Sequence, residues 1–203
     1  EQLTQGVFSR FTPITNLRGN RTEFVERMDH IGIASNSNII AESIFSGKLG
    51  LPVESRQTDM EVKVSMESFT SDKYGVIYKT RPPETMGGLR VSFITIGDTE
   101  LEFLENFNNQ HRAEIAHGTP GNTKQDQGAI TKYVDKYGPG LHHLAFKTPD
   151  INKTLKHLEK HNFRLIDTMG REGSRRSLIG FIHPASTGGV LIHFVEREEI
   201  TNA

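Results

Sequence analysis

Apolar and polar residues repeat in the same order in two stretches of the chain that lie more than one hundred residues apart. The first stretch is residues 28–34 (MDHIGIA) and the second is residues 141–146 (LHHLAF). When His30 is aligned with His143, apolar residues follow at the next position and at the third, with a small residue, Gly32 or Ala145, between them. This internal similarity indicates a duplicated module.

Each repeat has the pattern of a β-strand and is followed by a segment with helical spacing. Residues 36–50 end in glycine and carry apolar residues at helical intervals, namely Ile39, Ile40, Ile44, Phe45 and Leu49. Residues 150–162 begin at an aspartate suited to an N-cap and place Ile151, Leu155 and Leu158 on one face. Strand-like runs follow at 88–97 and 99–107 in the first module and at 163–169, 177–183 and 188–196 in the second. The pattern predicts an α+β fold of paired βαβββ modules.

The remaining segments define the domain organisation that we expect. It comprises an N-terminal arm (1–27), a first module (28–107) with an inserted hairpin at about 57–86, a connecting loop and short helix (108–139), a second module (140–197) and a tail (198–203). With 203 residues and 34% hydrophobic content, the chain can form one domain or two small modules in close contact.

Composition excludes several classes of function. The formal net charge of −1 provides no Lys/Arg excess for a nucleic acid backbone. The absence of cysteine excludes disulfides, thiolate metal sites and cysteine nucleophiles. No apolar run approaches 18 residues, so we expect no membrane span, and we expect a cytoplasmic protein. A cleaved leader stays open as an alternative, because residue 1 is not methionine.

The adjacent pair His142 and His143 offers one side chain to each face of a regular strand. The repeat selects His143 for a cleft, because it shares its register with His30. His142 is then expected on the core side as a packed, hydrogen-bonded histidine. Two equivalent positions on two equivalent strands would converge across a pseudo-twofold axis, which is why His30 and His143 are stronger candidates together than alone.

Two further polar residues occupy matching places between apolar neighbours in later strands. Glu102 lies between Leu101 and Phe103, and His193 lies between Ile192 and Phe194. His30, Glu102, His143 and His193 would form an N/O site suited to Zn²⁺, Mn²⁺, Fe²⁺, Co²⁺ or Ni²⁺. The alternative for Glu102 or His193 is a solvated residue or one that only supports the ligands.

Other charged and polar residues have two readings each. The basic cluster of Arg171, Arg175 and Arg176 is either a solvated turn or a site for an anionic substrate group such as phosphate or carboxylate. His183, in the Ile182-His183-Pro184 corner, either forms the turn or contacts substrate. Arg175, Arg176 and His183 are therefore candidate substrate-binding residues.

Five segments of the chain resemble the vicinal oxygen chelate superfamily, the glyoxalase-like metalloenzymes built from paired βαβββ modules. They are DHIGIA (29–34), GDTELEFLE (97–105), YGPGLHHLAF (137–146), FIHPASTGGV (181–190) and LIHFVE (191–196). The resemblance is greatest to the methylmalonyl-CoA epimerase branch. It implies a curved, mixed sheet that forms a cleft, one divalent metal ion per subunit and a homodimer.

The resemblance also implies roles for individual residues. The family binds its metal at the positions of His30, Glu102 and His143, with a fourth ligand, a glutamate, where His193 stands in this chain. A proposed family base is missing as well, because Val91 occupies its position. The usual acid/base assignment cannot be copied, so Glu102 and His193 are the candidate proton-transfer residues, and the sequence does not decide between them.

The implied function is that of a metal-dependent epimerase acting at a carbon next to a carbonyl through a metal-stabilised enolate. The substrate would be an acyl-CoA or a small polyhydroxy-ketone such as a cyclitol precursor, and the insertions weaken the acyl-CoA case. Alternatives are a metal-dependent lyase or Fe²⁺ dioxygenase of the same superfamily, and a non-catalytic small-molecule-binding protein of the resistance type.

Overall fold

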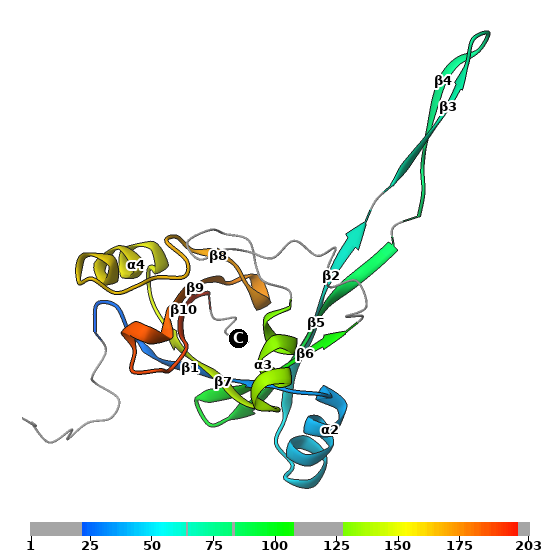
Figure 1. Ribbon diagram of the computed structural model, residues 1–203. Coiled ribbons are helices and arrows are strands. Elements are labelled where there is room, and N and C mark those ends of the chain that lie inside the picture. Colours follow the sequence, from blue (N-terminus) through cyan, green and yellow to red (C-terminus); the bar gives the residue numbers. More distant parts are fainter. Residues whose placement is uncertain (1–21, 64, 83, 108–127, 199–203) are drawn as a thin grey trace, which may run out of the picture.

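The computed structural model describes residues 22–63, 65–82, 84–107 and 128–198. An eight-stranded mixed sheet curls around a central space, and few helices accompany it (Figure 1). The strand order is β2-β5-β6-β1-β7-β10-β9-β8. The α+β class and the curved, mixed sheet predicted from the sequence are confirmed.

The two modules occupy the two halves of this sheet in mirrored order. The first contains β1 (Arg27–Ala34), α2 (Asn38–Glu42), a π-helical turn (Ser43–Lys48), β2 (Val53–Lys63), β5 (Glu84–Ile96) and β6 (Thr99–Phe107). After α3 (Ala129–Tyr137), the second contains β7 (Gly140–Lys147), α4 (Ile151–Lys160), β8 (Arg171–Glu172), β9 (Leu178–Ile182) and β10 (Ile192–Glu196). Short 3-10 turns span Ser174–Arg176 and Pro184–Ser186. Strands β1 and β7 pair antiparallel at the centre, flanked by parallel pairing of β1 with β6 and of β7 with β10.

One strand expected from the sequence does not form. Residues 163–169 make only an isolated bridge between Leu165 and Ile182. The backbone N–H groups of Ile166 and Asp167 both donate to the carbonyl of Phe181, at 2.9 and 3.2 Å, which interrupts the alternating ladder of a strand. The outer strand of the second module is instead β8, which pairs with β9.

A separate hairpin lies within the long connection between β2 and β5. Strands β3 (Met66–Ser71) and β4 (Gly75–Thr80) pair antiparallel and project far from the curled sheet (Figure 1). Gly75 begins β4 with φ of +78°, which glycine adopts without the steric cost of a Cβ. Apolar side chains of this hairpin, among them Met66, Ile77 and Tyr78, are exposed.

Three apolar clusters fix the helices against the sheet. Helix α2 packs through Ala41 on the outer face of the first module, against Ile94, Leu101 and Phe103. Helix α4 packs through Ile151 and Leu155 on the outer face of the second, against Ile182 and Phe194. Helix α3 contributes Ile130 to a cluster with Leu89, Val91, Phe93 and Leu104. Helices α2 and α4 thus cover the outer face, whereas the α3 cluster lies on the concave face and contributes Leu89, Phe93, Leu104 and Ile130 to a cavity there.

The helical segments agree only partly with the expected apolar faces. Helix α4 begins at Asp150, whose side chain accepts the backbone N–H of Lys153 at 2.8 Å. Helix α2 is short and continues as a π-helix, and its residues Ile39 and Ile40 are 80% and 62% exposed rather than packed. Within the described ranges, no helix has the length and apolar character needed to cross a membrane.

Three predicted segments lie wholly or mostly outside the described residues. They are residues 1–21 of the N-terminal arm, residues 108–127 of the connecting loop and residues 199–203 of the tail.

Candidate metal centre

Two rows of residues run across the four central strands on the concave face. In one row, Gly32 of β1 lies between Glu102 of β6 and His143 of β7. In the other, Ala145 of β7 lies between His30 of β1 and His193 of β10. Side chains directly opposite one another on neighbouring strands share a face of the sheet. Each small residue therefore leaves room for the two polar side chains beside it to converge.

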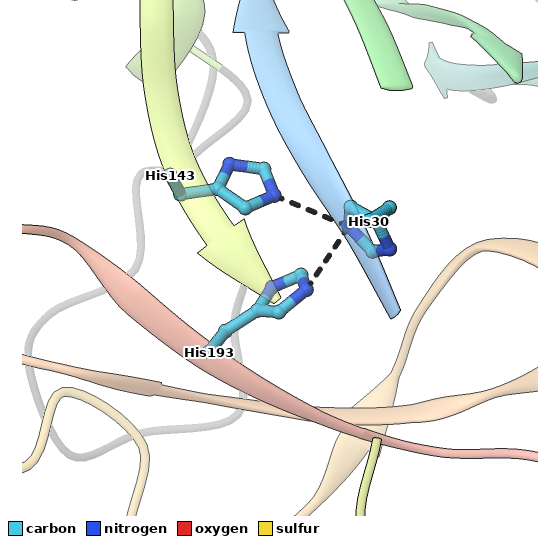
Figure 2. A group of neighbouring side chains, drawn as sticks. All are labelled: His30, His143 and His193. Carbon is cyan, nitrogen blue, oxygen red and sulfur yellow. Dashed lines mark hydrogen bonds between the residues drawn. The ribbon is translucent and has the colours of Figure 1, made fainter. Parts of the chain in front are cut away.

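The four polar side chains of these rows lie close together around Nε2 of His30. Nε2 of His30 lies 3.3 Å from Nε2 of His143, 3.2 Å from Nε2 of His193 and 3.2 Å from Oε2 of Glu102. The same Glu102 oxygen lies 3.2 Å from Nε2 of His143. Figure 2 shows the three imidazole rings turned toward one another from three different strands. All four residues are buried, and three of them, His30, His143 and His193, form one compact imidazole group that Glu102 adjoins.

This donor set fits a divalent cation. Zinc binds imidazole nitrogen at roughly 2.0–2.1 Å, which places neighbouring ligand atoms of a tetrahedral centre about 3.3 Å apart. The distances within the cluster, 3.2 and 3.3 Å, match that spacing. One hydrogen on Nε2 of His30 cannot form good hydrogen bonds to His143, His193 and Glu102 at the same time. A cation, in contrast, accepts an electron pair from each ligand atom around it. His30, His143 and His193 thus form a group that could hold a metal ion.

Two of the imidazoles, those of His30 and His143, are hydrogen-bonded through Nδ1 to the residue that precedes each in the sequence. Oδ1 of Asp29 lies 2.8 Å from Nδ1 of His30, and Nδ1 of His142 lies 2.9 Å from Nδ1 of His143. Such outer hydrogen bonds fix the ring orientation and the tautomer of a metal-binding histidine. The pair Asp29 and His30 is therefore matched, across the pseudo-twofold axis, by the pair His142 and His143.

A β-bulge in each strand explains how adjacent residues reach the same site. Along β1 and β7, Met28 pairs with Phe146 and His30 with Ala145, so Asp29 is an extra residue. Later in the same ladder Gly32 pairs with His143 and Ile33 with Leu141, which leaves His142 as the extra residue. A bulge interrupts the strict alternation of side chains.

The expected core position of His142 is consequently wrong. Its ring packs edge-on against Tyr133 of α3, at 4.9 Å between centroids, and lines the same cavity as His143. Nothing in the composition of either strand announces a bulge. The only sequence signal was the repeat itself, which aligns His142 with Asp29 just as it aligns His143 with His30.

His193 differs from the other two imidazoles. Its Nδ1 atom is buried and has no hydrogen-bond partner among the described residues. The ring contacts Phe181, at 4.5 Å between centroids, instead of a polar group. His193 is thus the imidazole of the cluster whose orientation is fixed least by hydrogen bonds.

Neighbouring charges lower the pKa values of Asp29 and Glu102 and raise the pKa of His30. Burial alone would raise the pKa of Asp29, but the His30 hydrogen bond and the Arg197 and Arg27 charges outweigh it and lower that pKa to about 2. Burial alone would lower the pKa of His30, but Glu102 and Asp29 together raise it to about 9. Burial likewise opposes the ionised form of Glu102, yet His30 and His143 hold its pKa well below the ordinary value.

The remaining histidines favour the neutral form. Burial lowers the pKa of His143, although Glu102 opposes this. Burial lowers the pKa of His193 well below its ordinary value, and His143, His30 and Arg171 add to the effect. Burial and the neighbouring His143 lower the pKa of His142 to about 4. Neutral imidazole is the form that binds a metal.

The cluster opens into a cavity of about 690 Å³. Its apolar lining includes Leu89, Phe93, Ile179 and Phe181, and its polar lining includes Arg171, Arg175, His183 and Arg197. A cavity of this size accommodates a small molecule.

Two of the three predicted substrate-binding residues line the cavity, and one does not. His183 lines the cavity, and its Nδ1 accepts the backbone N–H of Ala185 at 3.1 Å, so it also forms the turn. Arg175 lines the cavity, but its Nη1 is bound to Glu100 at 2.7 Å and its guanidinium lies 3.6 Å from the Phe93 ring centroid. Arg176 is exposed and is not part of the cavity lining.

Comparison with known proteins agrees with this architecture. A family model described as the Glyoxalase/Bleomycin resistance protein/Dioxygenase superfamily matches residues 29–181. The uncharacterized protein YqjC of Bacillus subtilis is 28% identical over 172 residues, covering 85% of this chain and 93% of that protein. The mitochondrial methylmalonyl-CoA epimerase of Dictyostelium discoideum is 26% identical over 111 residues, covering 54% of this chain and 57% of the epimerase.

Solved structures show the same fold. Methylmalonyl-CoA epimerase from Mycobacterium tuberculosis superposes with a TM-score of 0.57 at 23% identity, covering 88% of this chain and 93% of that one. Hypothetical protein BH1468 from Bacillus halodurans superposes with a TM-score of 0.60 at 23% identity, covering 87% and 98%. The resemblance inferred from the five sequence segments is confirmed: the chain belongs to the glyoxalase/bleomycin resistance protein/dioxygenase superfamily, the vicinal oxygen chelate proteins.

Proposed function

We propose that this protein is a divalent-metal-dependent epimerase that acts at a carbon next to a carbonyl group. The observation that carries the proposal is the convergence of His30, Glu102, His143 and His193, within 3.2 to 3.3 Å of His30 Nε2, at a cavity large enough for a small substrate. The relatives named as methylmalonyl-CoA epimerases support this reaction class.

The ligand set that we propose consists of His30, Glu102 and His143, with His193 as a fourth ligand. A divalent cation held there would polarise a substrate carbonyl and make the neighbouring C–H bond more acidic. Asp29 and His142 would keep the His30 and His143 rings in the ligating orientation.

Epimerisation also needs a group that removes a proton on one face of the substrate and one that returns it on the other. His193 is suited to remove a proton, because its lowered pKa keeps it neutral and its buried Nδ1 has no hydrogen-bond partner among the described residues. Glu102 is the second candidate, because its carboxylate lines the same cavity. Its lowered pKa and its contacts with His30 and His143 favour the ionised form, in which it can also act as a ligand.

The substrate class remains that inferred from the resemblance, an acyl-CoA or a small polyhydroxy-ketone. One structural neighbour was solved as methylmalonyl-CoA epimerase in complex with methylmalonyl-CoA and NH4+. The cavity lies at the metal cluster and would take the acyl part of such a molecule, or the whole of a small ketone.

Solvent exchange tests this function directly. The protein would be incubated in deuterated water with methylmalonyl-CoA, other 2-methyl acyl-CoA esters and keto-cyclitols, and deuterium at the α-carbon followed by NMR. The expected result is exchange with at least one substrate by the native protein and none by His143→Ala. Absence of exchange from every candidate would remove the epimerase proposal.

Single variants then separate the two proton-transfer candidates. Loss of one group stops proton removal from one face only, so each variant should still exchange the α-proton of one stereoisomer without converting it to the other. We expect this behaviour from His193→Gln. Glu102→Gln keeps an oxygen ligand but cannot accept the proton, so retained metal together with loss of exchange from one stereoisomer would identify Glu102 as a base.

We also propose a homodimer. The exposed apolar side chains of Ile39 and Ile40 in α2 and of Leu49, just after the π-helical turn, would be covered by a second copy. Light scattering after size-exclusion chromatography checks this, and we expect Ile39→Lys/Ile40→Lys to shift the mass toward a monomer. A monomeric native protein would contradict the proposal.

A further inference from the structure

An arginine that the proposed metal centre does not use lines the same cavity. Arg171 lies in β8 at the edge of the sheet, where it pairs with Ile179 of β9. Its side chain is 10% exposed, so nearly all of the guanidinium is removed from bulk water. A guanidinium keeps its positive charge at any physiological pH and carries five N–H donors, so burial requires partners for them.

Asp167 holds one side of this guanidinium. Nε of Arg171 donates to Oδ1 of Asp167 at 3.1 Å. Oδ2 of the same carboxylate accepts the backbone N–H of Phe181 at 2.9 Å, and Asp167 is itself buried. Asp167 is therefore fixed by the sheet, and it fixes the direction in which the arginine points.

The Nη1 atom of Arg171 has no such partner. It is buried, and no hydrogen-bond acceptor within the described part of the chain reaches it. A buried charged donor without an acceptor is unfavourable, because the water it has lost is not replaced. An acceptor supplied by a ligand in the cavity would complete its hydrogen bonding.

Phe181 connects this arginine to the proposed metal centre. The guanidinium carbon of Arg171 lies 5.3 Å from the centroid of the Phe181 ring. The same ring lies 4.5 Å from the ring of His193 and 5.7 Å from that of His143, centroid to centroid. A single aromatic ring separates the guanidinium from the imidazole cluster, so one small molecule can contact both.

The other arginines of the cavity are already engaged by the protein. Nη1 of Arg175 donates to Glu100 at 2.7 Å, and Nη2 of Arg197 donates to Asp29 at 3.1 Å. Nε of Arg175 is also buried without an acceptor, but the Glu100 bond and the Phe93 ring hold that guanidinium. Among the cavity arginines of the described residues, Arg171 is the one in which a terminal Nη atom is buried and lacks an acceptor.

We propose that Arg171 binds a carboxylate of the substrate. The substrate would then be a small acid, or the acid-bearing acyl part of a larger ester, whose carboxylate lies beside Phe181 while its reacting carbonyl faces the imidazoles. This inference rests on the proposed function and narrows its substrate class. Arginine pairs well with carboxylates through charge-assisted hydrogen bonds. A phosphate dianion fits less well, because Asp167 and Glu172 add negative charge at the same place.

Binding of malonate, measured calorimetrically on the protein as purified, tests this assignment. Malonamide is the uncharged counterpart of malonate, and the metal content is determined in each sample. We expect malonate to bind and malonamide to bind at least about tenfold more weakly. Arg171→Gln should weaken malonate binding by at least about tenfold, since it removes a charge-assisted hydrogen bond. Arg164→Gln, which removes an exposed arginine outside the cavity lining, is the matched control and should bind malonate like the native protein.

A second variant guards against loss of folding. Arg171→Gln leaves the buried Asp167 without its cation, whereas Arg171→Gln/Asp167→Asn keeps a neutral hydrogen-bonding pair, and thermal unfolding shows which variants are folded. The same weakening in the folded double variant supports the proposal. Native-like malonate affinity in either folded variant overturns it, and so does tighter binding of inorganic phosphate than of malonate.

The outcome is independent of the test of the proposed function. If the native protein exchanges deuterium but Arg171→Gln binds malonate as tightly as the native protein, the epimerase proposal stands and the proposed carboxylate site is rejected. Malonate binding that depends on Arg171, without α-proton exchange, would leave the carboxylate site and remove the epimerase.

Discussion

Gly32 and His143 lie so close that no side chain can stand between them. A Cβ added to Gly32 would lie 2.1 Å from Cε1 and 2.5 Å from Nε2 of the His143 ring. Gly32 is paired with His143 on one side and with Glu102 on the other, so its missing side chain provides the space in which two proposed ligands approach each other. The glycine is required by the close approach of the His143 ring and not by the backbone, because its φ is not positive.

Gly32→Ala should therefore weaken metal binding while the fold is kept. The added methyl group must displace the His143 ring, and we expect a fall in metal affinity of roughly 10- to 100-fold, the size seen when the support of a ligand is lost. Competition with a chromogenic chelator measures the affinity, and circular dichroism checks the fold. Ala145→Gly, which opens space at the equivalent position of the second module, is the control. Unchanged affinity in Gly32→Ala would mean that His143 is not a ligand.

His142 should act through the orientation of His143. His142→Phe keeps a ring against Tyr133 but removes the hydrogen bond to His143 Nδ1, and we expect metal affinity to fall by about 10-fold or more. His142→Asp copies the partner that His30 has in Asp29 and should preserve affinity. Equal losses in both variants would show that packing of the imidazole, and not its hydrogen bond, is what matters.

Strand periodicity was enough to place Glu102 and His193 on the concave face, and the internal repeat added His30 and His143. Glu102 and His193 each lie between apolar residues that pack under a helix, so alternation alone places them on the concave face. Gly32 pairs with Glu102 and His143, and Ala145 pairs with His30 and His193. In the sequence, each of these small residues follows the histidine of its repeat by two positions.

Features that break periodicity could not be predicted in the same way. The bulges at Asp29 and His142 depend on how two strands pair, which a pattern within one strand does not contain. The segment 163–169 has the apolar content of a strand but makes only an isolated bridge, because the N–H groups of Ile166 and Asp167 share the Phe181 carbonyl. The role of Arg171 follows from its distance to Asp167 and Phe181, which only the tertiary structure provides.

The pKa of His30 predicts that metal binding releases a proton. In the metal-free protein Glu102 and Asp29 raise this pKa to about 9, so His30 is largely protonated at pH 8. A metal must displace that proton, hence affinity should rise as the pH increases toward 9 and level off above it. A pH indicator in weak buffer should record close to one proton released per metal bound at pH 8. Asp29→Asn removes part of the cause and should reduce the release. Affinity that is independent of pH between 7 and 9 would contradict this assignment.

The same pKa has a consequence for the stability of the metal-free protein. A pKa raised above the value of about 6.5 for an unfolded chain means that protonated His30 favours the folded state. This contribution is fully present below about pH 6.5 and is lost as the pH rises through about 9. Denaturant unfolding of metal-free protein at pH 6.5 and at pH 9.5 measures the difference, and His30→Gln should remove it. If the native protein and His30→Gln showed the same difference in stability between pH 6.5 and pH 9.5, a protonated His30 in the folded protein would be excluded.

Activity should not depend on oxygen or on a redox-active metal. An epimerase needs its metal only as a Lewis acid, so α-proton exchange should continue anaerobically and with Co²⁺ or Mn²⁺ in place of the native ion. Exchange measured in a glove box with metal-reconstituted protein checks this. An absolute requirement for Fe²⁺ and O₂, with consumption of oxygen, would instead identify a dioxygenase of the same superfamily.

His193→Glu distinguishes a ligand from a proton carrier. The family that this chain resembles has glutamate at this position, and a carboxylate is also a good metal ligand, so metal content should be preserved. If His193 moves the proton, replacing it changes the basicity and the position of that group, and the rate of α-proton exchange should fall by roughly 10²- to 10⁴-fold. Metal analysis and exchange kinetics on the same preparation give both quantities, with Glu102→Gln as the comparison for loss of ligand charge. A His193→Glu protein that keeps its metal and exchanges within a few-fold of the native rate would restrict His193 to ligation and leave Glu102 as the base.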